Sequence, residues 1–103
     1  MSKVQTERIR KMESYLDEAS AAVAELSEAL ERYEKVQKKY YKLEDYYGSS
    51  RWMEDFEADE AGKLPADLKR GVLSEDAVYD LIADHRELMA RMQKAVLKSL
   101  EEK

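Results

Sequence analysis

Residues 5–47 read QTERIRKMESYLDEASAAVAELSEALERYEKVQKKYYKLEDYY, a stretch with neither glycine nor proline. Within it, apolar residues recur in alternating steps of three and four, the heptad pattern of a helix that packs along one seam. The seam residues are Ile9, Met12, Leu16, Ala19, Val23, Leu26, Leu30 and Tyr33. At about 1.5 Å per residue, the pattern predicts a single helix over residues 5–47 that is roughly 65 Å long.

The apolar stripe shifts after Tyr33. Its next members are Val36, Tyr40, Leu43 and Tyr47. A step of three stands where the heptad requires a step of four, so the stripe moves around the helix. We therefore expect the helix to change its packing partner near this point.

Glycines and serines divide the rest of the chain. Gly48, Ser49 and Ser50 predict a turn, because glycine ends helices and serine hydroxyls cap the helix that follows. A short helix with an apolar side is then expected at about 51–61. Gly62 ends it.

A connector at 62–73 and a last helix at about 75–101 complete the chain. Pro65 opens what reads as one helical turn, which Gly71 closes. Ser74 is a good N-cap for the last helix, which carries a broad apolar stripe almost to its end.

These elements predict an all-α fold. The long N-terminal helix packs antiparallel against the short helix and the long C-terminal helix, as a helical hairpin or bundle. The two later helices laid end to end nearly match the length of the first, so residues 1–103 are expected to form a single helical domain. A homo-oligomer would cover what remains of the seam.

The composition narrows the class of function. The formal net charge is −5 and the pI is about 5.0, so the chain lacks the basic face that nucleic acid and anionic lipid require. No stretch is apolar enough for a membrane span, and the first residues are too polar for a signal peptide. The chain has no cysteine, which fits a reducing compartment. We expect a cytoplasmic protein that binds neither nucleic acid nor membrane.

Aromatic residues are concentrated around the turn at Gly48. Tyr46 points away from the helical face that carries Tyr47, so one small core cannot hold all of these rings. One interpretation is a small core that pins the turn. The other is a protein-binding surface in which exposed tyrosines and Trp52 act beside Arg51.

Support for catalysis is weak. The carboxylates between residues 54 and 60 could serve a divalent cation only with a second pair on a facing helix, where Asp80 and Asp84 are the candidates. His85 is the sole histidine and lies at the edge of an apolar stripe, where histidines are more often packed than catalytic. No nucleophile constellation, phosphate loop or metal-binding histidine pair occurs. We therefore predict no catalytic residue, no metal and no cofactor.

A longer motif, LPADLKRGVLSEDAVYDL, occupies residues 64–81. In this motif the chain resembles a family of small bacterial proteins known as domain of unknown function 4298. The resemblance extends to Arg8-Ile9, Met12-Glu13, Leu16-Asp17 and Tyr46-Tyr47-Gly48-Ser49 with Trp52. It implies a stand-alone cytosolic bacterial protein, and it transfers no activity, ligand or catalytic residue.

Within the motif, Lys69 and Arg70 are two adjacent cations. One of them alone would be enough to complement the end of a helix dipole. Together with backbone amides they could hold a phosphate or a partner's carboxylate. The leading hypothesis is a noncatalytic module that binds an unidentified protein partner. Its recognition surface consists of Tyr46, Tyr47, Arg51, Trp52, Lys69 and Arg70. The alternative is a small enzyme or ligand-binding protein for a phosphorylated or anionic compound, with Asp80, Asp84 or His85 as acid or base.

Overall fold

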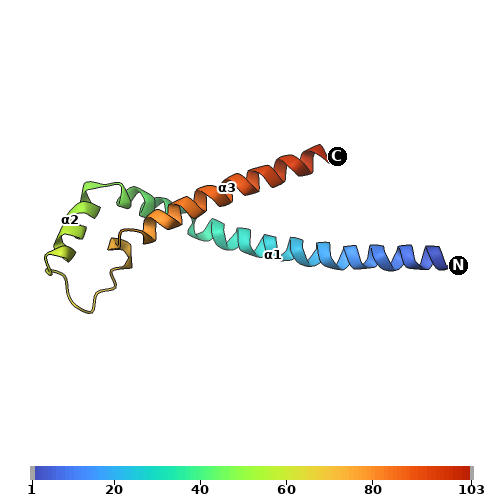
Figure 1. The fold of residues 1–103 in the computed structure, drawn as a ribbon, viewed down its shortest axis with the longest axis horizontal. Helices are drawn as coiled ribbons and strands as arrows, with labels where there is room; N and C mark the ends of the chain where they lie inside the picture. The colour runs from blue at the N-terminus through green and yellow to red at the C-terminus, as the bar shows by residue number, and fades with distance from the viewer. Residues whose placement is uncertain (1, 103) are drawn as a thin grey trace. The chain divides into compact units, whose positions relative to one another are not determined.

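The computed structural model describes residues 2–102 and consists of helices joined by loops (Figure 1). The helices are α1 (Lys3–Tyr47), α2 (Ser50–Glu60) and α3 (Ala77–Glu101), with a 3-10 turn, η1 (Gly71–Leu73), before α3. Residues 2–102 contain no strand, so the predicted all-α fold with one long, one short and one long helix is confirmed. None of the helices in this range is long and apolar enough to cross a membrane.

The chain divides into two compact units. The first is residues 1–39, which belong to α1 from Lys3 onward, and the second is residues 40–103. The division lies a few residues after Tyr33, where the apolar stripe of the sequence shifts. The expectations of a single domain, and of α3 packed antiparallel along the earlier heptads of α1, stay predictions.

Ser2 caps the start of α1, a role that the heptad pattern did not predict. The Ser2 hydroxyl accepts a hydrogen bond from the Gln5 amide at 3.0 Å, and the Ser2 carbonyl accepts one from the Thr6 amide at 3.0 Å. Serine suits this position because its oxygen satisfies an amide that has no partner inside the helix. The helix therefore starts at Lys3 rather than at residue 5.

The second unit is organised around a small core. Among residues 2–102, the buried hydrophobic side chains are Tyr40 in α1, Leu73 in η1 and Val78 in α3. η1 contacts both α2 and α3. This 3-10 turn therefore lies at the centre of the packing within the unit.

Gly62 ends α2 as the sequence predicts. Its φ is 70°, the left-handed conformation that glycine adopts without strain. The Lys63 amide donates to the Ala58 carbonyl and the Gly62 amide to the Asp59 carbonyl, each at 3.0 Å. These two bonds form a Schellman motif, which satisfies carbonyls at the helix end.

The turn between α1 and α2 is built differently. Gly62 is the one residue with positive φ among those that the structure describes, so Gly48 ends α1 without a left-handed turn. Ser49 holds the turn, because its hydroxyl donates to the Tyr46 carbonyl at 2.6 Å. The same hydroxyl accepts the Trp52 amide at 3.4 Å and so caps α2.

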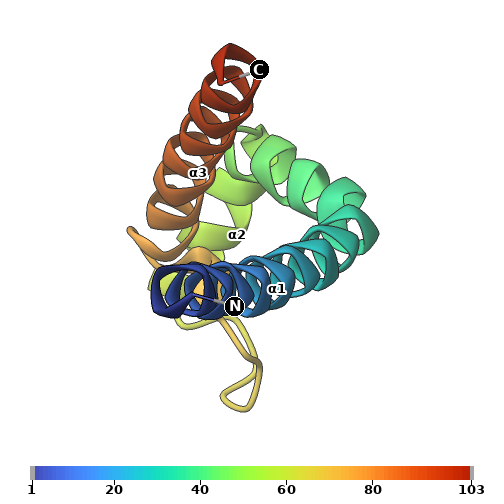
Figure 2. The same ribbon diagram turned by 90° about the vertical axis from the view of Figure 1, so that its right-hand side faces the viewer.

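The connector between α2 and α3 is the yellow to orange loop in Figures 1 and 2. Pro65 opens a turn that closes at Leu68, whose amide donates to the Pro65 carbonyl at 3.2 Å. Gly71 does not close this turn but begins η1. The Ser74 hydroxyl accepts the first amide of α3, that of Ala77, at 3.2 Å. The N-cap of α3 is nevertheless Asp76, so the prediction of Ser74 as the N-cap is wrong by two residues, and α3 starts at Ala77 rather than at residue 75.

Candidate interaction surfaces

Three aromatic rings pack together where α1 meets α2. The Trp52 ring lies edge-on to Tyr47 with centroids 5.1 Å apart, and it stacks on Phe56 with centroids 5.2 Å apart. The indole Nε1 donates to the Val72 carbonyl at 3.0 Å, which joins α2 to η1. The rings are half-buried, so they pin the turn while part of each ring remains accessible.

Tyr46 connects the end of α1 to α2. Its hydroxyl donates to Asp55 Oδ2 at 2.5 Å. This hydrogen bond, together with partial burial and the charge of Asp55, raises the pKa of the Tyr46 hydroxyl to about 12. The direction follows because only the neutral phenol can donate to the carboxylate.

An ion pair between Arg70 and Asp59 joins the connector to α2. Nη1 of Arg70 lies 2.8 Å from Oδ1 of Asp59, with exposed side-chain fractions of 37% and 24% respectively. A partly exposed pair of this kind contributes about 1 kcal/mol or less, but it directs the guanidinium toward α2. The hypothesis that Lys69 and Arg70 hold an anion together stays a prediction.

The structure thus gathers part of the predicted surface around α2. Tyr47 touches Trp52, while Tyr46 and Arg70 each bind a carboxylate of the helix. Arg51 and Lys69 are exposed, and neither forms an ion pair with any residue in the range 2–102. The role of these six residues in binding remains a prediction.

His85 and Tyr40 form a contact that the sequence analysis missed. Their rings stack with centroids 4.0 Å apart and an angle of 19°, and Tyr41 lies edge-on to His85 at 6.0 Å. The Tyr40 hydroxyl also donates to Glu44 at 2.8 Å. Both residues lay on apolar stripes, but periodicity does not reveal which stripes meet.

Within residues 2–102, no group of three His, Asp or Glu side chains could hold a metal ion.

The seam of α1 is exposed. The exposed fraction is 58% for Leu16, 67% for Val23 and 62% for Leu26. The remaining exposed large side chains of the seam are Ile9, Met12 and Leu30. α3 also carries exposed apolar side chains, at Leu81, Leu88, Val96, Leu97 and Leu100. Both long helices therefore present apolar surface that a partner could cover.

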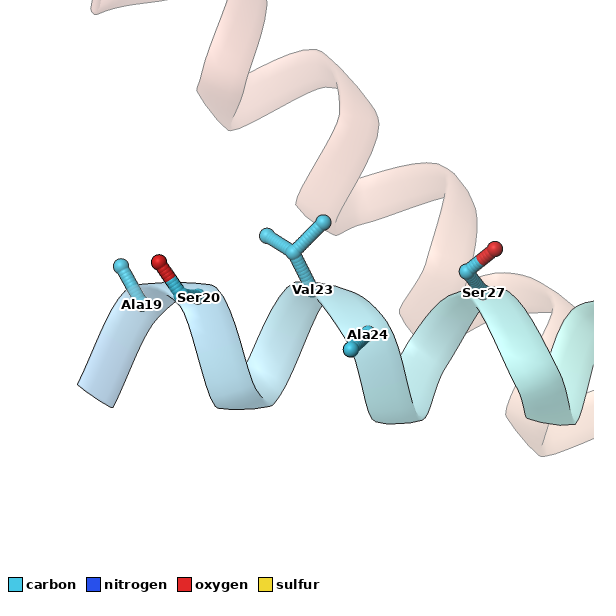
Figure 3. Close-up of a pocket in the computed structure, with 5 residues that line it drawn as sticks. All are labelled: Ala19, Ser20, Val23, Ala24 and Ser27. Carbon is cyan, nitrogen blue, oxygen red and sulfur yellow. The ribbon is translucent and has the colours of Figure 1, made fainter. Parts of the chain in front are cut away.

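A shallow hollow lies on the middle of α1 (Figure 3). It is lined by Ala19, Ser20, Val23, Ala24 and Ser27. The last four have the spacing i, i+3, i+4 and i+7, which is the arrangement of a hole that receives one side chain from a facing helix. The side chains that line the hollow are small, since four of the five are alanine or serine.

The comparison with known families covers most of the chain. A family model described as Domain of unknown function (DUF4298) matches residues 9–95. The chain belongs to this family. The resemblance stated from residues 64–81 is thus confirmed. No curated protein matches this DUF4298 protein.

The structure gives the motif of this DUF4298 protein a role in packing. Leu73 and Val78 supply two of the buried side chains of the second unit. The Ser74 hydroxyl accepts the Ala77 amide at the start of α3, and Arg70 pairs with Asp59. Much of the motif therefore serves to place η1 in contact with both α2 and the start of α3.

Proposed function

We propose that this DUF4298 protein is a noncatalytic helical module that associates with a second copy of itself through α1. The observation that supports the proposal is the exposed seam of the first unit. A lone helix cannot bury a heptad seam, whereas a second helix laid along the seam removes it from water.

The seam can supply the free energy that association needs. Burying a large apolar side chain contributes about 1.5–3 kcal/mol, and those of the seam are roughly half exposed, so each would contribute about 1 kcal/mol. Six such side chains on each of two copies give roughly 12 kcal/mol. Association costs about 4–15 kcal/mol in lost translational and rotational freedom. The seam alone therefore supports a dimer of modest affinity, which flanking contacts would strengthen.

The turn between α1 and α2 forms the second part of the proposal. Tyr46, Tyr47, Arg51, Trp52, Lys69 and Arg70 would recognise a protein partner of the assembled module. The partly accessible rings and the exposed Arg51 and Lys69 support this role, because tyrosine, tryptophan and arginine dominate binding hot spots.

Sedimentation equilibrium across a dilution series tests the self-association. The wild type should show a mass near twice 12.0 kDa. Leu16→Glu combined with Leu26→Glu places charges in the seam and should yield monomers. Glu18→Gln combined with Glu28→Gln changes exposed residues outside the seam and should leave the dimer intact.

Fluorescence of Trp52, the sole tryptophan, then shows whether the second unit of the monomeric variant is still folded. A wild type that stays monomeric at every concentration would overturn the proposal.

A further inference from the structure

We infer that the second copy lies antiparallel along the seam of α1, with a two-fold axis that crosses the seam at the level of residue 21, between Ala19 and Val23. This inference rests on the proposed self-association and specifies its geometry. The seam is symmetric about residue 21, so each seam position meets the position equally far on the other side of the axis. The facing pairs, one residue from each copy, are Ile9 with Tyr33, Met12 with Leu30, Leu16 with Leu26 and Ala19 with Val23.

The sizes of the side chains in the middle of the seam decide between antiparallel and parallel pairing. In a parallel pair, Ala19 would face Ala19 of the other copy, and two small side chains would leave a void at the hollow. In the antiparallel pair, Val23 of each copy lies opposite Ala19 of the other, so a larger side chain faces a smaller one. A closed two-fold dimer of this kind contains each such contact twice.

The polar residues that border the seam set the register. A shift of one heptad in one direction would place Leu30 opposite Gln5. The opposite shift would place Met12 opposite Gln37 and Ile9 opposite Tyr40, which is already buried in the second unit. Either shift removes apolar pairs from the interface, so the register centred on Ala21 buries the most seam.

The interface reaches the size that a stable dimer requires. In this register, residues 3–39 of the two copies overlap, and these are the residues of α1 that lie in the first unit. That overlap is roughly 54 Å long, and with a helix about 11 Å wide it covers roughly 600 Å² on each copy. The total of about 1,200 Å² lies at the lower limit of specific protein interfaces.

The charges next to the seam do not oppose this pairing. Residues that flank the seam pair along each edge of the interface, offset by two positions from the seam pairs. Glu13 would face Ser27 of the other copy and Arg8 would face Val36. Ser20 and Ala22 would each approach the same residue of the other copy. No like charges meet at these closest flanking positions. The remaining acidic residues of the middle of α1 lie on the outer faces, where salt at physiological strength screens charges over about 8 Å.

The absence of cysteine from the sequence makes the register directly testable. Equal amounts of Ala19→Cys and Val23→Cys are mixed, oxidised and analysed by mass spectrometry. The inference predicts a mixed disulfide well above the half expected from random pairing, and little disulfide when either variant is oxidised alone. A mixture of Ala19→Cys with Leu16→Cys is the matched control, because it reports the register shifted by one heptad.

Sedimentation under reducing conditions separates the inference from the proposed function. A dimer that crosslinks Ala19→Cys to itself is parallel, and a dimer that forms no Ala19–Val23 disulfide has another register. Both results overturn the inference and leave self-association standing, whereas a monomeric wild type overturns both. If Val23→Cys itself weakens the dimer, the pair Leu16→Cys with Leu26→Cys reads the same register and must give the mixed disulfide.

Discussion

Replacing Trp52 by phenylalanine removes the hydrogen bond that joins α2 to η1. The phenylalanine ring can still pack between Tyr47 and Phe56, over a smaller area than the indole, but it cannot donate to the Val72 carbonyl, which lies 3.0 Å from the indole Nε1. Val72 is half-buried, so water can partly replace the lost donor. We expect the free energy of unfolding to fall by about 1 kcal/mol, which lowers the folded to unfolded ratio about fivefold.

Urea unfolding of the wild type and Trp52→Phe, at the same protein concentration, measures this change. Far-ultraviolet circular dichroism is the appropriate signal, because the substitution removes the sole tryptophan. Met53→Leu is the control, since Met53 is 49% exposed and its replacement should change the stability by less than about 0.5 kcal/mol. If Trp52→Phe unfolded at the wild-type urea midpoint with an unchanged slope, the link between α2 and η1 would contribute nothing.

Gly62→Ala should destabilise the protein by about 1–2 kcal/mol, because its φ of 70° penalises any Cβ even though no atom lies within 4 Å of the added carbon. Gly71→Ala, which also has open space but no positive φ, is the control, and equal urea midpoints for the two variants would refute the backbone argument. For Tyr46, a folded-state pKa of about 12 against an ordinary 10.0 means that its bond to Asp55 stabilises the fold fully below pH 10. That stabilisation is lost as the pH rises through about 12, so the stability difference between wild type and Tyr46→Phe should shrink over this range. A difference that stays constant or widens there would contradict the assignment.

Local patterns in the sequence were enough to predict the helices and the exposed apolar seam of α1. The seam from Ile9 to Tyr33 follows from heptad spacing alone, because residues three and four apart share a face of a helix. Gly62 ends α2 as predicted, since capping depends on neighbours within one turn. Ser74 binds the first amide of α3, although the N-cap itself is Asp76. The missed cap at Ser2 was also local, and a serine just ahead of the first turn was its signal.

Tertiary structure decided which of these local elements touch. The Tyr40–His85 stack, the Trp52–Val72 hydrogen bond and the Arg70–Asp59 ion pair join residues that are far apart in the chain. Each depends on the path of a connector whose turns at Pro65 and Gly71 determine where η1 and α3 begin. Periodicity assigns a residue to a face of its own helix, whereas the partner of that face is selected by packing between distant segments.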